Sequence, residues 1–236
     1  MEGLLLFGLL IGMRHALEAD HLAAVASLVS RRQSLAETLR QGGAWGLGHT
    51  LTLFLFGSVV IFMDTVMPER LAAGLELAVG FMLVLLGADV LRRVVRERVH
   101  FHVHRHGGER HFHAHSHAGE ARAAHDPERH HHPHPQGFPL RALLVGLMHG
   151  MAGSAAVILL ALQTMTSPLQ GVFYILVFGI GSMLGMALLS VVISLPMRFS
   201  AGRLTWAYNG LQLLVGTITV VLGLLVIREQ GALFML

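Results

Sequence analysis

Apolar residues run through this chain in six long stretches, separated by short polar segments and by one long polar segment near the middle. A helix rises about 1.5 Å per residue, so about 20 apolar residues cross the roughly 30 Å of hydrocarbon in a bilayer. The stretches lie at residues 3–29, 43–63, 71–95, 140–163, 169–196 and 207–228. This pattern predicts an all-α membrane protein with six transmembrane helices.

The two halves of the apolar pattern match each other in order. Residues 12–15 (Gly-Met-Arg-His) match residues 146–149 (Gly-Leu-Met-His), and residues 46–49 (Gly-Leu-Gly-His) match residues 179–182 (Gly-Ile-Gly-Ser). With three helices in each half, the second copy enters the membrane upside down relative to the first. The sequence therefore predicts a 3+3 inverted repeat, an architecture common among transporters, whose substrate site lies near the midplane.

These features divide the chain into a first three-helix repeat at 1–96, a disordered segment at 97–138 and a second three-helix repeat at 139–236. Arginine supplies all 17 basic residues, and most of them lie in the loops after the first, third and fifth helices. The positive-inside rule then places both termini outside and the central segment in the cytoplasm, in a bacterial or archaeal inner membrane. These arginines also explain the isoelectric point near 10.5, so the lipid bilayer and not nucleic acid is the expected partner.

A polar motif, Arg-His-Ala-Leu-Glu-Ala-Asp-His at residues 14–21, interrupts the first apolar stretch. Ionisable groups at that depth cost about 2.5–3.5 kcal/mol each on insertion scales, and they persist mainly where they bind something or pair. Neutral imidazole together with carboxylate suits nickel, cobalt, zinc, iron or manganese. His15, Glu18, Asp20 and His21 are therefore candidate ligands for a divalent metal ion.

The spacing of these candidates does not suit a straight helix. At about 100° per residue, His15 and Asp20 lie about 140° apart, and His15 and His21 lie about 120° apart. Either the helix breaks near residues 18–20, or only some of the three residues bind the ion. Discontinuous helices are common at transporter ion sites. The alternative is a buried polar network that only fixes helix packing.

Two more histidines lie in apolar stretches. His49 follows Gly46 and Gly48, and glycines at these places let its helix approach another helix closely. His149 occupies the place that matches His15 in the repeat. We expect both to complete a metal site, the alternative for His49 being a hydrogen bond to a neighbouring residue.

The central segment holds 13 of the 17 histidines of the chain, mixed with Gly, Pro, Glu and Arg. This composition predicts disorder, because it cannot bury a core. Such a tract binds nickel, zinc, cobalt or copper at several sites, and the absence of cysteine excludes thiolate ligands. The histidines expected to capture metal are His100, His102, His104, His106, His111, His113, His115, His117, His130, His131, His132 and His134.

The motif at residues 14–21 resembles the His-x4-Asp-His segment of the nickel/cobalt transporter family (NiCoT), and Gly48-His49-Thr50 is similar to that family's second histidine motif. Within the family, the chain resembles the short, urease-accessory-type nickel permeases. The resemblance implies high-affinity, selective transport of Ni²⁺ or Co²⁺ across the inner membrane, with His15, Asp20 and His21 essential. The chain departs from the long members, which have eight helices and carry the motif on the second.

The function predicted from these features is import of Ni²⁺, or of Co²⁺, through an intramembrane His/Asp site, followed by capture in the cytoplasmic histidine tract. A cytoplasmic nickel chaperone, or a urease or hydrogenase maturation protein, is a candidate receiver of the ion. Two alternatives stay open: efflux of the same ions through the same architecture, and a membrane metalloenzyme with Glu18 as its obvious general base. We expect a transporter and not an enzyme, with no cofactor besides the transported ion.

Overall fold

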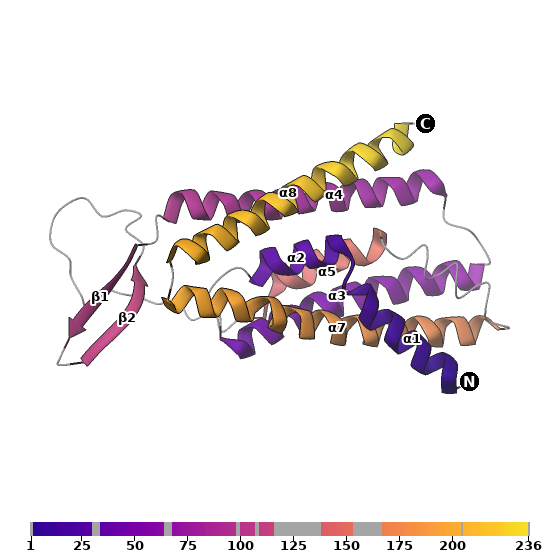
Figure 1. The fold of residues 1–236 in the computed structure, drawn as a ribbon. Helices are drawn as coiled ribbons and strands as arrows, with labels where there is room; N and C mark the ends of the chain where they lie inside the picture. Colours follow the sequence, from indigo (N-terminus) through magenta and orange to yellow (C-terminus); the bar gives the residue numbers. More distant parts are fainter. Residues whose placement is uncertain are drawn as a thin grey trace.

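The computed structural model of the protein describes residues 2–29, 34–63, 68–97, 100–106, 109–115, 138–152, 167–203 and 205–235. Within these ranges the chain forms seven helices and one two-stranded hairpin (Figure 1). The helices are α1 (Glu2–His15), α2 (Ala19–Val29), α3 (Leu35–Met63), α4 (Glu69–Glu97), α5 (Leu140–Ala152), α7 (Pro168–Arg203) and α8 (Thr205–Met235). The strands are β1 (His100–His106) and β2 (Glu109–His115). The all-α class predicted for the body of the chain is confirmed.

Four of these helices are long and apolar enough to cross a membrane. The spans are Leu35–Met63, Glu69–Arg96, Pro168–Met197 and Trp206–Leu233. They contain or nearly coincide with the second, third, fifth and sixth predicted stretches. α3 begins before its predicted stretch because Ser34 and Glu37 cap its first turn. The Glu37 amide donates to Ser34 Oγ (3.2 Å), and the Ser34 amide donates to Glu37 Oε2 (2.8 Å).

The first predicted stretch is a broken helix. α1 ends at His15, and α2 begins at Ala19. At the break the amides of Leu17 and Glu18 donate to the carbonyls of Arg14 (2.9 Å) and His15 (3.1 Å), three residues back instead of four. The motif predicts either a broken helix or an incomplete set of ligands, and the structure has the broken helix. The fourth predicted stretch contains α5, and its residues 153–163 lie outside the described ones.

The helices pack mainly in pairs: α1 against α7, α3 against both α5 and α7, and α4 against α8. Figure 1 shows the short helices α2 and α5 enclosed between the long ones. The largest fully buried side chains include Trp45 of α3 and Phe178 of α7. Large apolar side chains cover the outside, where Leu85 is 72% and Leu188 is 57% exposed. Such an exposed apolar surface is typical of helices that face lipid.

Two glycines permit the closest of these helix contacts. A Cβ atom at Gly12 of α1 would collide with the carbonyl oxygen of Phe178 in α7, and one at Gly146 of α5 would collide with that of Trp45 in α3. Backbones approach this closely only where a small residue lies at the interface. Gly12 and Gly146 also occupy matching places in the two halves of the sequence.

The hairpin lies in the segment that the sequence predicts to be disordered. β1 and β2 pair antiparallel, from His100 opposite His115 to His106 opposite Glu109. Histidines alternate here with residues such as Phe101, Val103 and Phe112, and this period of two favours a strand. A Gly-Gly dipeptide separates the strands in the sequence, as two-residue hairpin connections prefer. His117, His130, His131, His132 and His134 lie outside the described residues.

Candidate metal site

The break between α1 and α2 brings the two histidines of the first motif into contact. His15 is the last residue of α1, and His21 lies in the first turn of α2. Their ring centroids are 4.4 Å apart, with the rings inclined at 65°. A straight helix would point these side chains in different directions, so the irregular turn at residues 16–18 creates the pair.

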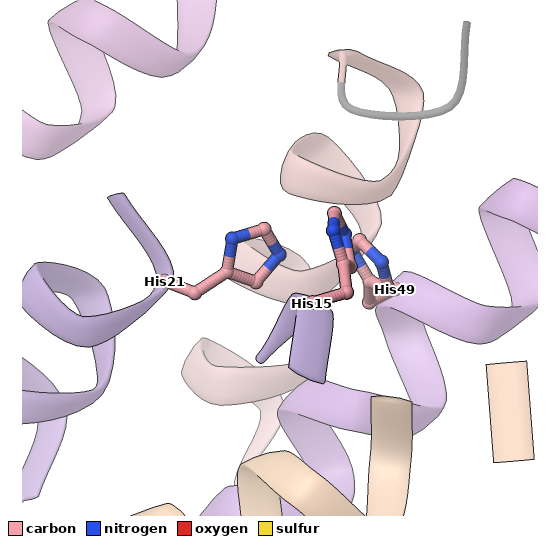
Figure 2. Close-up of side chains that lie close together, drawn as sticks. All are labelled: His15, His21 and His49. Carbon is pink, nitrogen blue, oxygen red and sulfur yellow. The ribbon is translucent and has the colours of Figure 1, made fainter. Parts of the chain in front are cut away.

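His49 of α3 joins this pair from across the bundle (Figure 2). Its ring centroid lies 5.3 Å from that of His15 and 5.2 Å from that of His21. One nitrogen from each of the three histidines lies within 4.8 Å of the others. This spacing is small enough for the three imidazoles to close on one metal ion.

Asp20 and His149 form a second group with the same His21. His149 of α5 donates from Nε2 to Asp20 Oδ2 (2.9 Å), and His21 donates from Nδ1 to Asp20 Oδ1 (3.0 Å). The rings of His21 and His149 are 4.2 Å apart. Potential ligand atoms of all three residues again lie within 4.8 Å of one another. Two groups of three candidate ligands therefore share one histidine.

The imidazoles are buried, and several of their nitrogens have no hydrogen-bond partner. His21, His49 and His149 are at most 1% exposed, and His15 is 8% exposed. Within the described part of the chain, His21 Nε2, His149 Nδ1 and both ring nitrogens of His49 lack a partner. Burial of an unpaired polar group is costly. A bound cation would give these nitrogens the partner that the described residues do not supply.

Carboxylates fix the tautomers of these histidines. Asp20 accepts from His21 Nδ1 and His149 Nε2, which leaves the opposite nitrogen of each ring bare. Glu18 accepts from His15 Nδ1 (2.8 Å), which leaves His15 Nε2 as the candidate ligand atom. The Glu18 side chain is 57% exposed and belongs to neither group of three. Glu18 is therefore placed to orient the His15 ring.

Two aromatic side chains line the cluster and were not recognised from the sequence. The Trp45 ring lies 5.5 Å from that of His21 and 5.9 Å from that of His149, and Phe178 lies 5.3 Å from His15. Both directly precede the matching glycines, Gly46 and Gly179, of the two halves. That shared place in the two matching stretches of sequence is the signal that could have identified them as a pair.

Comparisons with known proteins agree with this chemistry. The chain is 31% identical over 226 residues to "Urease accessory protein UreH" of Bacillus sp. (strain TB-90), covering 94% of this chain and 89% of the relative. It is 37% identical over 71 residues to "High-affinity nickel transport protein" of Cupriavidus necator, covering 30% of this chain and 20% of the relative. No solved structure matches the chain significantly. The NicO family model, described as "High-affinity nickel-transport protein", matches residues 3–228. The chain therefore belongs to the NicO family of nickel transporters.

Proposed function

We propose that this protein imports Ni²⁺, and Co²⁺ as a second substrate, through the cluster of His15, Asp20, His21, His49 and His149. The observation that carries the proposal is the convergence of four buried imidazoles and one carboxylate from four different helical segments. A donor set of nitrogen with one carboxylate oxygen suits Ni²⁺ and Co²⁺. The membership of the NicO family supports nickel as the substrate.

The two overlapping groups support a stepwise passage of the ion. In the proposed path, the ion is first held by His15, His21 and His49, and then by Asp20, His21 and His149. His21 belongs to both groups, so the ion stays beside one histidine while its other ligands change. The negative charge of Asp20 offsets part of the cost of placing a divalent cation in a buried site.

Matched helix contacts support the proposed 3+3 inverted repeat. The contact of Gly12 with Phe178 has a counterpart in the contact of Gly146 with Trp45. α4 and α8 pack on each other through Gly80, Gly87, Gly216 and Gly223, of which Gly80 lies near Gly223 and Gly87 near Gly216. These paired contacts are what two repeats of opposite orientation would give. Rocking of such units around a central site is a common means of alternating access.

We propose that the ion moves inward, with both termini outside and the histidine tract in the cytoplasm. The loops rich in arginine support this orientation through the positive-inside rule. An inside-negative potential favours inward movement of a doubly charged ion by about 4.6 kcal/mol per 100 mV. A cytoplasmic nickel chaperone or a urease or hydrogenase maturation protein would receive the ion, and the relative's name, urease accessory protein, supports that part. The protein acts in this scheme as a transporter and not as an enzyme.

One observation favours efflux as the second candidate. A histidine tract in the cytoplasm is also suited to collect surplus metal for export. Deleting residues 100–134 separates the two: an exporter would lose metal tolerance, whereas an importer would keep its transport.

Total cellular nickel, measured by elemental analysis, tests the proposal. Cells would express the native chain, His149→Ala or His49→Ala at matched membrane levels. Leu47→Ala is the control, since Leu47 lies on the same helix as His49 but is 47% exposed. We expect the native chain and the control to raise cellular nickel above the level of empty cells and both histidine variants to raise it much less. Less nickel than in empty cells would reverse the direction, and no difference would refute nickel transport.

A further inference from the structure

A cavity lies where α2 and α4 end and where α3 and α5 begin. Its volume is about 100 Å³, which is room for about three water molecules or for an ion with part of its hydration shell. In the proposed orientation this end of the bundle faces the cytoplasm. The cavity is lined by Ser27 and Leu28 of α2, Gln41 of α3, Arg93 of α4, and Arg141 and Ala142 of α5.

Three of these helices also carry the candidate metal ligands. Each has a cavity residue seven or eight positions from its histidine, in the pairs Leu28 and His21, Gln41 and His49, and Ala142 and His149. Seven or eight residues of helix rise about 11 Å and make about two turns. The cavity therefore lies about 11 Å from the metal cluster along all three helices at once.

One layer of apolar side chains separates the cavity from the metal cluster. Ala24 of α2, Trp45 of α3 and Val145 of α5 each lie three or four residues from the histidine of the same helix. All three are buried and belong to one packed cluster. An apolar layer does not let a charged ion pass, so the path from the cluster to the cavity is closed in this structure.

Two arginines of the cavity wall share the carboxylate of Asp89. Arg141 Nη2 donates to Asp89 Oδ2 (3.0 Å) and so joins α5 to α4. Arg93 Nη2 lies 3.6 Å from the same oxygen, and Arg93 Nε donates to the carbonyl oxygen of Asp89 (3.1 Å). The Arg141 side chain is 54% exposed, and ion pairs exposed to this degree are weak. The link between α4 and α5 can therefore open at little cost.

We propose that this cavity is the inner vestibule of the ion path and that the ion pair of Asp89 with Arg141 holds it closed. While the pair is formed, α5 stays against α4, and two positive charges on the wall repel a divalent cation. When Arg141 turns away to the solvent, α5 is released and the charge of Asp89 is left to attract the ion. Gln41 Oε1, which is buried and has no hydrogen-bond partner among the described residues, would accept from the waters that the ion regains. This inference deepens the proposed function and rests on it.

Cysteine labelling tests the closure, because the native chain has no cysteine. Ser27→Cys places a thiol on the cavity wall. Ser194→Cys is the matched control, since Ser194 of α7 is also 3% exposed but does not line the cavity. Each is combined with Asp89→Asn, which removes the ion pair, or with Asp89→Glu, which keeps the charge. Full-length protein in opened membranes reacts with methyl methanethiosulfonate, a neutral reagent whose approach does not depend on these charges.

We expect Asp89→Asn to raise the labelling rate at position 27 about fivefold, the shift in population that loss of an exposed ion pair gives. Arg141→Gln should have the same effect, and Asp89→Glu should stay near the native rate. The rate at position 194 should not change. An unchanged rate at position 27 would overturn the proposal. An equal rise at both positions would overturn it too, because it would show a general loosening of the bundle.

Nickel connects the cavity to the ion path. With Asp89 intact, saturating Ni²⁺ should also raise the labelling rate of Ser27→Cys, because passage of the ion opens the vestibule. His149→Ala should remove this response. Labelling that depends on Asp89 but ignores Ni²⁺, in a chain that accumulates nickel, would overturn the assignment of the cavity to the path.

Nickel accumulation in cells keeps this inference distinct from the proposed function. A chain that accumulates nickel, but whose labelling responds to neither Asp89→Asn nor Ni²⁺, would refute the vestibule alone. A chain whose labelling responds to both, but which accumulates no nickel, would refute import alone.

Discussion

His21 is the residue on which both groups of candidate ligands depend. Its ring centroid lies 4.4 Å from that of His15 and 4.2 Å from that of His149. Its Nδ1 donates to Asp20, and its Nε2 has no partner among the described residues. One histidine thus belongs to both groups of candidate ligands.

Replacing His21 should reduce nickel uptake more than replacing a histidine that belongs to only one of the two groups. We expect His21→Ala to abolish uptake at every nickel concentration, because no group of three remains. His15→Ala should leave Asp20, His21 and His149 in place and raise the KM for Ni²⁺ by at least about tenfold, in line with losses seen at other metal sites. Uptake of radioactive nickel over a concentration series measures both. Equal effects of the two substitutions would contradict the shared role of His21.

Glu18 provides a second test at the residue scale. Because it accepts a hydrogen bond from His15 Nδ1, Glu18→Gln retains an oxygen acceptor, whereas Glu18→Ala does not. We expect the alanine variant to raise the KM for Ni²⁺ by about 10- to 100-fold and the glutamine variant to stay near the native value. If both substitutions abolish uptake, Glu18 binds the ion directly, as the sequence alone suggests.

At the scale of the elements, the close contacts between helices require glycine, whose side chain is a single hydrogen atom. α5 and α3 approach each other where Gly146 meets the carbonyl group of Trp45, and any side chain there would enter occupied space. The same contact positions His149, one turn further along α5, beside the other ligands. A change in packing at Gly146 should therefore also change the position of His149 relative to the other candidate ligands.

Adding one methyl group tests this coupling. Gly146→Ala should lower the free energy of unfolding by about 1–3 kcal/mol, the usual cost of overpacking. Gly43→Ala, on α3, is the matched control, because a Cβ atom there meets nothing within 4 Å, and it should be neutral or stabilising by up to about 1 kcal/mol. Thermal unfolding in detergent compares the two. A Gly146→Ala variant as stable as the control would contradict the contact.

The sequence could predict the helices better than the packing of the helices around the candidate site. Apolar length alone located the four long helices, and the motif at residues 14–21 required either a broken helix or an incomplete set of ligands. The sequence did not decide between these two, because the choice depends on which helices surround the turn. The hairpin was missed because the abundance of histidine outweighed its period-two alternation with Phe101 and Val103. Trp45 and Phe178 looked like ordinary core residues, since only tertiary packing places them against the histidines.

At the scale of the whole molecule, the arrangement in the membrane can be tested directly. The native chain has no cysteine, so any introduced cysteine is unique. We expect Glu69→Cys, at the exposed start of α4, to react with a membrane-impermeant thiol reagent in intact cells. Ala36→Cys, at the exposed start of α3, should react only after the membrane is opened. The reverse labelling pattern would invert the proposed orientation and, with it, the side on which the hairpin lies.

The pairing of α1 with α7 and of α5 with α3 joins the first helix of each half to the first long helix of the other half. Each half therefore helps to cover the core of the other: Phe178 lies against Gly12 and His15 of the first half, and Trp45 lies against Gly146 and His149 of the second. A chain cut within the central segment would yield two fragments that behave as subunits of an obligate heterodimer. Each fragment would be an incomplete protein until it met the other in the same bilayer, so assembly and metal binding would appear together or not at all.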